Sequence, residues 1–212
     1  MTTMRRENTN GPLPQPGYPP VVVKLGGSLY SQIAELVPIL RTSARPLLII
    51  PGGGVFADMV RKSGVEGDFA HWMAIASMDQ YGWFVASHGI PATMILKVPD
   101  RTEVFLPYCS MRQRDPLPHS WDVTSDTIAA WVADLLALDL LLLKSVDGIY
   151  ENGDLLELVT GPVRTDVVDP FFIPFVQKRK IRTTIINGSR VDRVKKSLNG
   201  EIVPGTRIST TF

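Results

Sequence analysis

The segment from Val21 to Ser28, VVVKLGGS, constrains the fold of this chain more than any other. A short run of β-branched residues, with prolines before it and glycines after it, predicts a buried β-strand rather than a helix. Apolar residues at helical spacing begin at Leu29, directly after the glycine pair. The folded part of the chain is therefore predicted to open with a strand, a glycine turn and a helix.

This first turn has the composition of an anion-binding site. Gly26 and Gly27 lack Cβ atoms, so their backbone N–H groups can approach a phosphate closely, and a helix N-terminus favours negative charge. Lys24 would add a positive charge, and Ser28 a hydroxyl group, to the same space. On its own, so short a motif is more often a tight turn with a surface lysine, and the interpretation needs support from elsewhere in the chain.

A second unit of the same kind follows. The apolar run Pro46–Ile50 ends at Gly52, Gly53 and Gly54, and helical spacing restarts from Val55. A glycine turn ahead of a helix again suits an anion. Two such units predict two cradles, one for each of two anionic groups.

A third segment places an acid at a helix start. Thr124 or Ser125 can cap a helix whose first turn holds Asp126. An acid at that position can also do no more than complement the helix dipole. The segment is therefore predicted to be a capped helix, with a role for Asp126 left open at this point.

The most apolar strand of the sequence, Leu140–Leu143, leads into Lys144 and an Asp147–Gly148 turn. A turn of this kind lies at the carboxyl end of its strand, where an open α/β sheet binds its ligands. The order of strands, glycine turns and helices predicts a doubly wound α/β fold with one binding crevice.

Three further expectations concern the connecting segments. A mostly buried helix is predicted from Asp68 to His88, with Asp68 as its N-cap. The proline-rich stretch from Pro107 to Pro118 is predicted to be an irregular loop, and Gly205–Ile208 an edge strand.

Composition limits the classes of partner. The 212 residues hold 22 Lys and Arg against 21 Asp and Glu, and this net charge of +1 gives no reason to expect nucleic acid or a membrane surface. The single cysteine, Cys109, excludes an internal disulfide and fits a cytoplasmic location. Residues 1–20 are predicted to be a disordered tail, and residues 21–212 a single domain.

The chemical inventory of the predicted crevice consists of glycine turns, lysines and aspartates. It contains no Ser-His-Asp set and no metal-ligand spacing, and neither GxxxxGK[ST] nor GxGxxG occurs in the chain. Glycine turns with cations suit phosphoryl transfer, in which positioning and neutralisation of oxygen charge carry most of the catalysis.

Taken together and in order, the motifs resemble those of the amino acid kinase superfamily over residues 21–208. The motifs that carry the resemblance are KLGGS at 24–28, PGGG at 51–54, TSDTIAA at 124–130, LLLKSVDGIY at 141–150, and the later NG and GTRI segments. The resemblance implies a three-layer αβα sandwich around a mainly parallel open sheet, the carbamate kinase-like fold. It also implies an ATP-dependent kinase that uses Mg²⁺ brought with the nucleotide, and a homodimer or higher homo-oligomer.

The resemblance further implies roles for individual residues. Lys24 would hold the transferred phosphoryl group, and Asp126 would orient Lys24 and Lys144. The residues implied in phosphate binding are Gly26, Gly27 and Ser28; those in ATP binding are Lys144, Val146, Asp147, Gly148 and Tyr150; those on the acceptor side are Gly52, Gly53, Gly54, Thr124 and Ser125.

The chain departs from this pattern in one respect that affects catalysis. Amino-acid-specific members often carry a second lysine late in the chain, and nothing between Thr160 and Lys180 reproduces its motif. Lys144 and Lys178 are the two candidates for that role.

A second departure concerns the acceptor. Where isopentenyl phosphate kinases carry a histidine after the triple glycine, this chain has Asp58, which favours an acceptor with a positive charge. Segments 51–61, 70–82 and 121–131 look like the kinases of methanofuran biosynthesis, which phosphorylate 5-(aminomethyl)-3-furanmethanol phosphate to its diphosphate. His71 and Trp72 would then contact that acceptor together with Asp58. Uridylate kinase is the alternative enzyme, and a non-catalytic anion-binding or storage protein is the alternative of another class.

Overall fold

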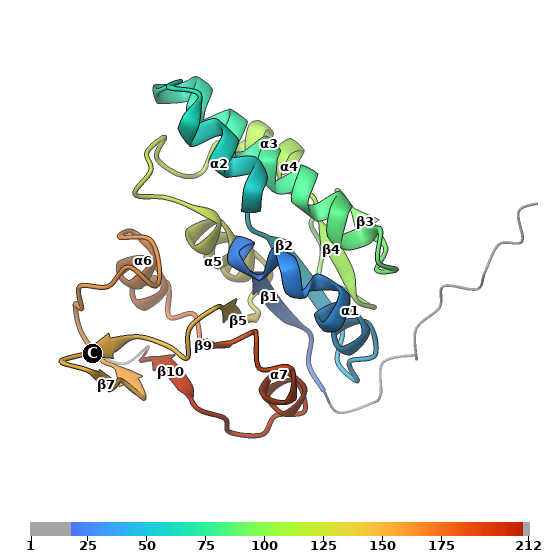
Figure 1. Cartoon of the computed structure of the whole chain (residues 1–212), viewed down its shortest axis with the longest axis vertical. Helices are drawn as coiled ribbons and strands as arrows, with labels where there is room; N and C mark the ends of the chain where they lie inside the picture. The colour runs from blue at the N-terminus through green and yellow to red at the C-terminus, as the bar shows by residue number, and fades with distance from the viewer. Residues whose placement is uncertain (1–17, 210–212) are drawn as a thin grey trace, which may run out of the picture.

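The computed structural model describes residues 18–209, so most of the predicted N-terminal tail lies outside the described residues. These residues form three layers, with a sheet between two layers of helices (Figure 1). The sheet has eight strands in the order β3-β4-β2-β1-β5-β9-β10-β8. Its strands are β1 Val21–Leu25, β2 Leu47–Pro51, β3 Ala92–Thr93, β4 Glu103–Phe105, β5 Asp139–Lys144, β8 Leu158–Val159, β9 Thr183–Asn187 and β10 Gly205–Ile208.

Most pairs of neighbouring strands in this sheet run parallel, and β9 with β10 is the antiparallel pair. A separate two-stranded ribbon is formed by β6 Tyr150–Glu151 and β7 Asp154–Leu155. The predicted αβα sandwich with a mainly parallel open sheet is therefore confirmed.

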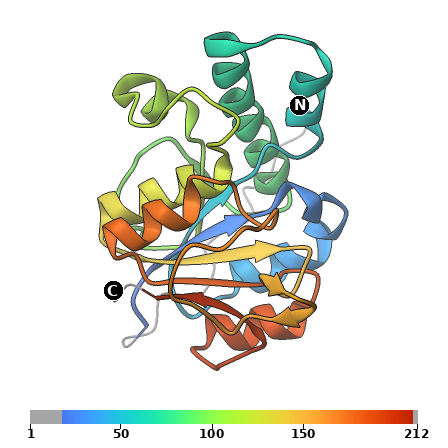
Figure 2. The same ribbon diagram turned by 90° about the vertical axis from the view of Figure 1, so that its left-hand side faces the viewer.

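The helices cover both faces of the sheet. They are the 3₁₀ helix η1 Gly27–Gln32, followed by α1 Ile33–Arg41, α2 Gly54–Lys62, α3 Gly67–Ala86, α4 Tyr108–Arg114, α5 Ser125–Leu136, α6 Phe172–Arg179 and α7 Val191–Leu198. Helices α5 and α6 lie on one face, and α7 lies on the opposite face (Figure 2). No described helix is long and apolar enough to cross a membrane.

Strand alternation decides which side chains of β1 and β5 meet α5. Val22 of β1 packs in the core beneath α5 and α6, whereas Val21 and Val23 pack in the core beneath α1 and α7. Because successive side chains point to opposite faces, Lys24 lies on the α5 face with Val22. Lys144 follows Leu142 of β5 in the same way.

Three of the expectations for the connecting segments were wrong. Pro107–Pro118 is not a continuous loop, because Tyr108–Arg114 forms α4, which begins directly after Pro107, where a proline does not interrupt a helix. Glu66, not Asp68, stands at the N-cap of α3. Strand β10 is not at the sheet edge, because the short strand Leu158–Val159 pairs outside it.

Candidate active site

Lys24, Asp126 and Lys144 form a buried ionic cluster on the α5 face of the sheet. The Lys24 ammonium lies 2.8 Å from Asp126 Oδ1, and the Lys144 ammonium lies 2.7 Å from Asp126 Oδ2. The side chains of Lys24 and Asp126 are 5% exposed, and that of Lys144 is 15% exposed. The carboxylate is thus occupied on both oxygens, which is the arrangement expected for a residue that orients two lysines.

Electrostatics fix the charge of this cluster. Burial raises the pKa of Asp126, but the two adjacent ammonium groups outweigh it and hold that pKa below its usual value. Burial, together with the positive charge of Lys24, lowers the pKa of Lys144 to about 8. Within this cluster two lysine side chains face the single carboxylate of Asp126, an arrangement that suits a phosphate group.

Asp169 holds the start of α5 in place, and the sequence analysis missed it. Its carboxylate accepts hydrogen bonds from the backbone N–H and hydroxyl groups of Thr124, at 3.0 and 2.9 Å, and of Thr127, at 3.1 and 2.6 Å. Thr124 is the N-cap residue, so one of the two predicted caps is confirmed. Burial and the nearby charge of Asp126 raise the pKa of Asp169.

The two glycine turns lie against one another. A Cβ atom on Gly27 would come within 2.5 Å of the Gly54 nitrogen, and one on Gly52 within 2.8 Å of the Gly27 nitrogen. Only residues without side chains allow this approach. The helix expected behind the first turn begins as η1, and Ser28 is exposed on it.

The residues expected to bind ATP lie after β5. The Asp147 carboxylate accepts hydrogen bonds from Asn187 Nδ2 and Arg193 Nη1, each at 2.8 Å. The hydrogen bond from Asn187 lowers the pKa of Asp147, against a small effect of desolvation, and Arg193 lowers it further. Val146 and Tyr150 are exposed, and Gly148 packs against Thr206. Their contact with ATP remains a prediction.

Of the two candidates for the late lysine, Lys144 contacts Asp126, whereas Lys178 lies exposed in the last turn of α6. The geometry therefore favours Lys144.

A cavity of about 90 Å³ lies between α2, α3, the 119–125 segment and α5. Its lining includes Gly53, Thr124, Ser125 and His71, four of the residues expected on the acceptor side. The other residues that line it are Ala57, Arg61, Gly67, Ala70, Ala74, Ile75, Met78, His119, Ser120, Trp121, Val123 and Ile128.

Asp58 and Trp72 lie outside this lining, so the geometry gives no support to the acceptor contact expected of either, and that contact remains a prediction. Asp58 lies on the exposed side of α2, where its carboxylate pairs with Arg61 at 2.9 Å, because the neighbouring Ala57 takes the cavity-facing position. The Trp72 ring packs behind the cavity wall, with the Arg112 guanidinium 4.5 Å from its centroid.

Three side chains with metal-binding atoms, His71, Asp115 and His119, come together within 4.8 Å in the described part of the chain. They belong to α3, the C-cap of α4 and the segment after it, so no local spacing in the sequence could reveal them.

A mainly parallel sheet with two adjoining glycine turns and a buried pair of lysines is an arrangement suited to phosphoryl transfer. Residues 19–161 match the model of the amino acid kinase family, which is more than half of the chain, and the chain therefore belongs to this family of kinases. ATP use follows from that membership.

The chain is similar over most of its length to several proteins of named activity. It is 29% identical over 204 residues to the [5-(aminomethyl)furan-3-yl]methyl phosphate kinase of Methanocaldococcus jannaschii, covering 85% of this chain and 93% of that protein. The fold is similar to that of the uridylate kinase of Archaeoglobus fulgidus, with a TM-score of 0.68, 19% identity, and coverage of 89% of this chain and 99% of that one. It is also similar to an isopentenyl phosphate kinase, with a TM-score of 0.61, 16% identity, and coverage of 90% and 100%.

Proposed function

We propose that this kinase transfers the γ-phosphoryl group of ATP to a small phosphomonoester that carries an ammonium group. The first-choice acceptor is [5-(aminomethyl)furan-3-yl]methyl phosphate, which would become the diphosphate of a methanofuran-type pathway. The observation that carries this proposal is the Lys24–Asp126–Lys144 cluster beside two adjoining glycine turns. The curated relative supports the choice of acceptor because the match spans most of both chains.

The cluster supplies charge rather than a general base. A phosphomonoester already carries ionised oxygens near neutral pH, since its second pKa is about 6, so the nucleophile needs no deprotonation. Asp126 is poorly suited to accept a proton, because both its oxygens contact lysines and its pKa is lowered. Lys24 and Lys144 would stabilise the charge that develops on the transferred group.

ATP and Mg²⁺ enter this proposal through the residues around the cluster. The backbone of Gly26 and Gly27 would cradle the phosphates, and the segment 144–150 would contact the nucleotide. Mg²⁺ would be held mainly by the nucleotide phosphates and water. We therefore expect the ATP-free protein to bind Mg²⁺ weakly, and stoichiometric tight binding in a calorimetric titration would contradict this part of the proposal.

The size of the cavity supports a small acceptor over a nucleotide. Pockets for drug-sized ligands measure roughly 300 to 1,000 Å³, whereas this cavity measures about 90 Å³. A single furan ring is a better match for that space than the uracil and ribose of uridine monophosphate.

Steady-state assays with the two acceptors test the proposal. At saturating MgATP, we expect kcat/KM for the aminomethyl-furan phosphate to exceed that for uridine monophosphate by at least about 100-fold, a difference of roughly 3 kcal/mol. Equal or better use of uridine monophosphate would overturn the acceptor assignment. Nucleotide binding without turnover of either acceptor would instead favour the non-catalytic alternative.

The oligomeric state and location belong to the same proposal. A homo-oligomer is part of the proposal, and its interface would bury some of the exposed apolar side chains, of which Trp83, Ile95 and Val98 are three. A cytoplasmic location fits the free Cys109. Light scattering after size-exclusion chromatography would test the oligomer, and a monomer at micromolar concentration would contradict it.

A further inference from the structure

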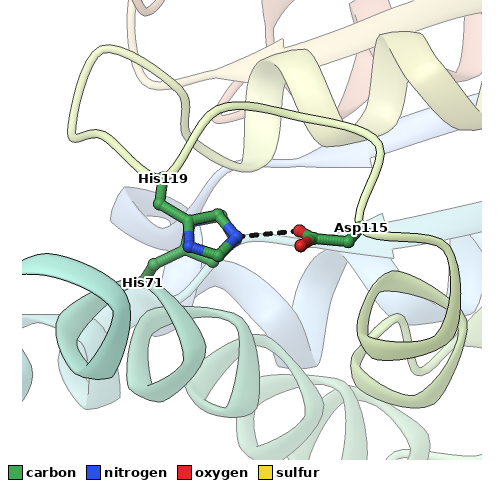
Figure 3. Close-up of side chains that lie close together, drawn as sticks. All are labelled: His71, Asp115 and His119. Carbon is green, nitrogen blue, oxygen red and sulfur yellow. Dashed lines mark hydrogen bonds and ion pairs between the residues drawn. The ribbon is translucent and has the colours of Figure 1, made fainter.

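Four side chains, Asp68, His71, Asp115 and His119, form a compact cluster at one wall of the cavity. The proposed phosphoryl transfer does not use them. His119 donates from Nδ1 to Asp68 at 2.7 Å and from Nε2 to Asp115 at 2.8 Å. The His71 ring stacks on the His119 ring, with 3.9 Å between centroids and 17° between planes (Figure 3). His71 and His119 both line the cavity.

The hydrogen bonds determine the charge of this cluster. A histidine whose two ring nitrogens both meet carboxylate oxygens holds two protons and is therefore a cation. Consistent with this, the hydrogen bonds to Asp115 and Asp68 raise the pKa of His119. Within this cluster, one imidazolium against two carboxylates leaves one negative charge in excess.

His71 stays neutral, and one of its ring nitrogens is buried without a hydrogen-bond partner. Burial and the neighbouring His119 lower the pKa of His71. Its Nε2 atom is buried and has no hydrogen-bond partner in the structure. A buried nitrogen without a partner costs free energy in the unliganded protein, which a suitable ligand would recover.

We propose that this cluster recognises the ammonium group of the acceptor, with His71 Nε2 as hydrogen-bond acceptor and the Asp68–His119–Asp115 array as the compensating negative charge. The inference rests on the proposed function and deepens it. It assigns to His71 and its neighbours the role that the sequence pattern suggested for Asp58, whose carboxylate does not line the cavity and is paired with Arg61, which does.

A metal ion is the competing ligand for the same side chains, and the geometry favours it less. The lone pairs of imidazole lie in the ring plane, so two ligating rings must point toward a common centre. The rings of His71 and His119 are stacked nearly parallel, and both nitrogens of His119 already meet carboxylates.

The test compares two acceptors that differ in the ammonium group alone. One is the aminomethyl-furan phosphate, and the other is its analogue with a methyl group in place of the aminomethyl group. We expect the wild-type enzyme to prefer the first, and His71→Leu to lower kcat/KM for it by about 10- to 100-fold, the effect of losing one charge-assisted hydrogen bond. The loss should appear mainly as a higher KM. For the methyl analogue, kcat/KM should change by less than about 3-fold.

Two further variants complete the design. His88→Leu, at an exposed position in the turn that follows α3, is the matched control and should leave kcat/KM for both acceptors unchanged. Asp68→Asn alters an exposed side chain and removes the excess negative charge, so it should reduce the preference for the amine in the same direction even if His71→Leu does not fold.

The outcomes separate this inference from the proposed function. If the wild-type enzyme phosphorylates neither acceptor, the proposed function fails and the inference falls with it. If the enzyme uses the amine, but His71→Leu and Asp68→Asn leave the preference unchanged or weaken both acceptors equally, the inference alone is wrong. Stoichiometric zinc that survives dialysis in the wild type and is lost in His71→Leu would also overturn it, in favour of a metal site.

Discussion

Lys24 and Lys144 contact opposite oxygens of one carboxylate, although they lie on different strands. Strands β1 and β5 are parallel neighbours in which Lys24 pairs with Leu142, so Lys144 lies one alternation further along the same face. Two like charges are held close together only because Asp126 lies between them. A bound phosphate would relieve the remaining repulsion, which supports the proposal that the pair binds an anion.

Replacement of Lys24 by alanine should lower turnover by about 100-fold or more, the effect of losing one preorganised electrostatic contact. Folding should be largely preserved, because the remaining Lys144–Asp126 pair is electrically balanced. Steady-state kinetics and a thermal melt measure the two effects. Lys178→Ala, at an exposed position in α6, is the control and should retain wild-type turnover. Loss of activity in that variant instead would assign the late lysine to Lys178.

The lowered pKa of Lys144 predicts a falling limb in the pH profile. As pH rises through about 8, Lys144 loses its proton and its charge. We expect kcat/KM, which reports the free enzyme, to fall over that range. Lys144→Arg keeps the charge at all these pH values and should shift or abolish the limb even if its maximal rate is lower. An unchanged limb in this variant would show that another group titrates.

The lowered pKa of Lys144 also makes the free energy of unfolding depend on pH, and for stability a rise in pH is favourable. The unfolded lysine keeps its proton up to its ordinary pKa of 10.5, whereas the folded one releases it near 8. The unfolded state therefore binds more protons between these values, and the unfavourable contribution of Lys144 to folding lessens as pH rises through that window.

Asp169 is expected to act through the residues it positions. Asp169→Asn replaces one accepting oxygen by a donor, so hydrogen-bond donors of Thr124 and Thr127 lose their partner. We expect a loss of about 1 to 3 kcal/mol in the free energy of unfolding, with reduced kcat because Asp126 follows Thr124 in the first turn of α5. Denaturant titration and kinetics measure both. Asp166→Asn, nearby and exposed, is the control. Normal stability and rate for Asp169→Asn would remove it from the site.

The contact between the glycine turns predicts different costs for two similar substitutions. In Gly27→Ala the new Cβ would meet the Gly54 backbone at 2.5 Å, whereas in Gly161→Ala it would meet nothing within 4 Å. We expect Gly27→Ala to lose about 1 to 3 kcal/mol of stability through overpacking and to weaken ATP binding, and Gly161→Ala to change neither. Thermal unfolding measures the stability of both variants, and nucleotide titration measures their ATP binding. Equal behaviour would show that the turns can separate.

The ionic cluster was expected from the resemblance to the kinase family, and strand alternation agrees with it. Lys24 and Lys144 lie at or next to the carboxyl ends of strongly apolar strands, so their faces follow from their neighbours. Asp169 and His119 lie in irregular segments whose positions depend on hydrogen bonds to distant residues, which no local pattern encodes. The sequence could not decide which residue of α2 lines the cavity, because one position along a helix turns a side chain by about 100°, and it is Ala57 rather than Asp58 that does so.

The lysines of the cluster lie on strands of the central sheet, whereas most of the cavity wall is supplied by α2, α3 and the segment that follows α4. Substitutions in these two helices can therefore alter what is phosphorylated without disturbing how it is phosphorylated. After gene duplication, a copy of such an enzyme could acquire a new metabolite by a few changes on two helices. Divergence among paralogues is expected to concentrate there, while β1 and β5 tolerate little change.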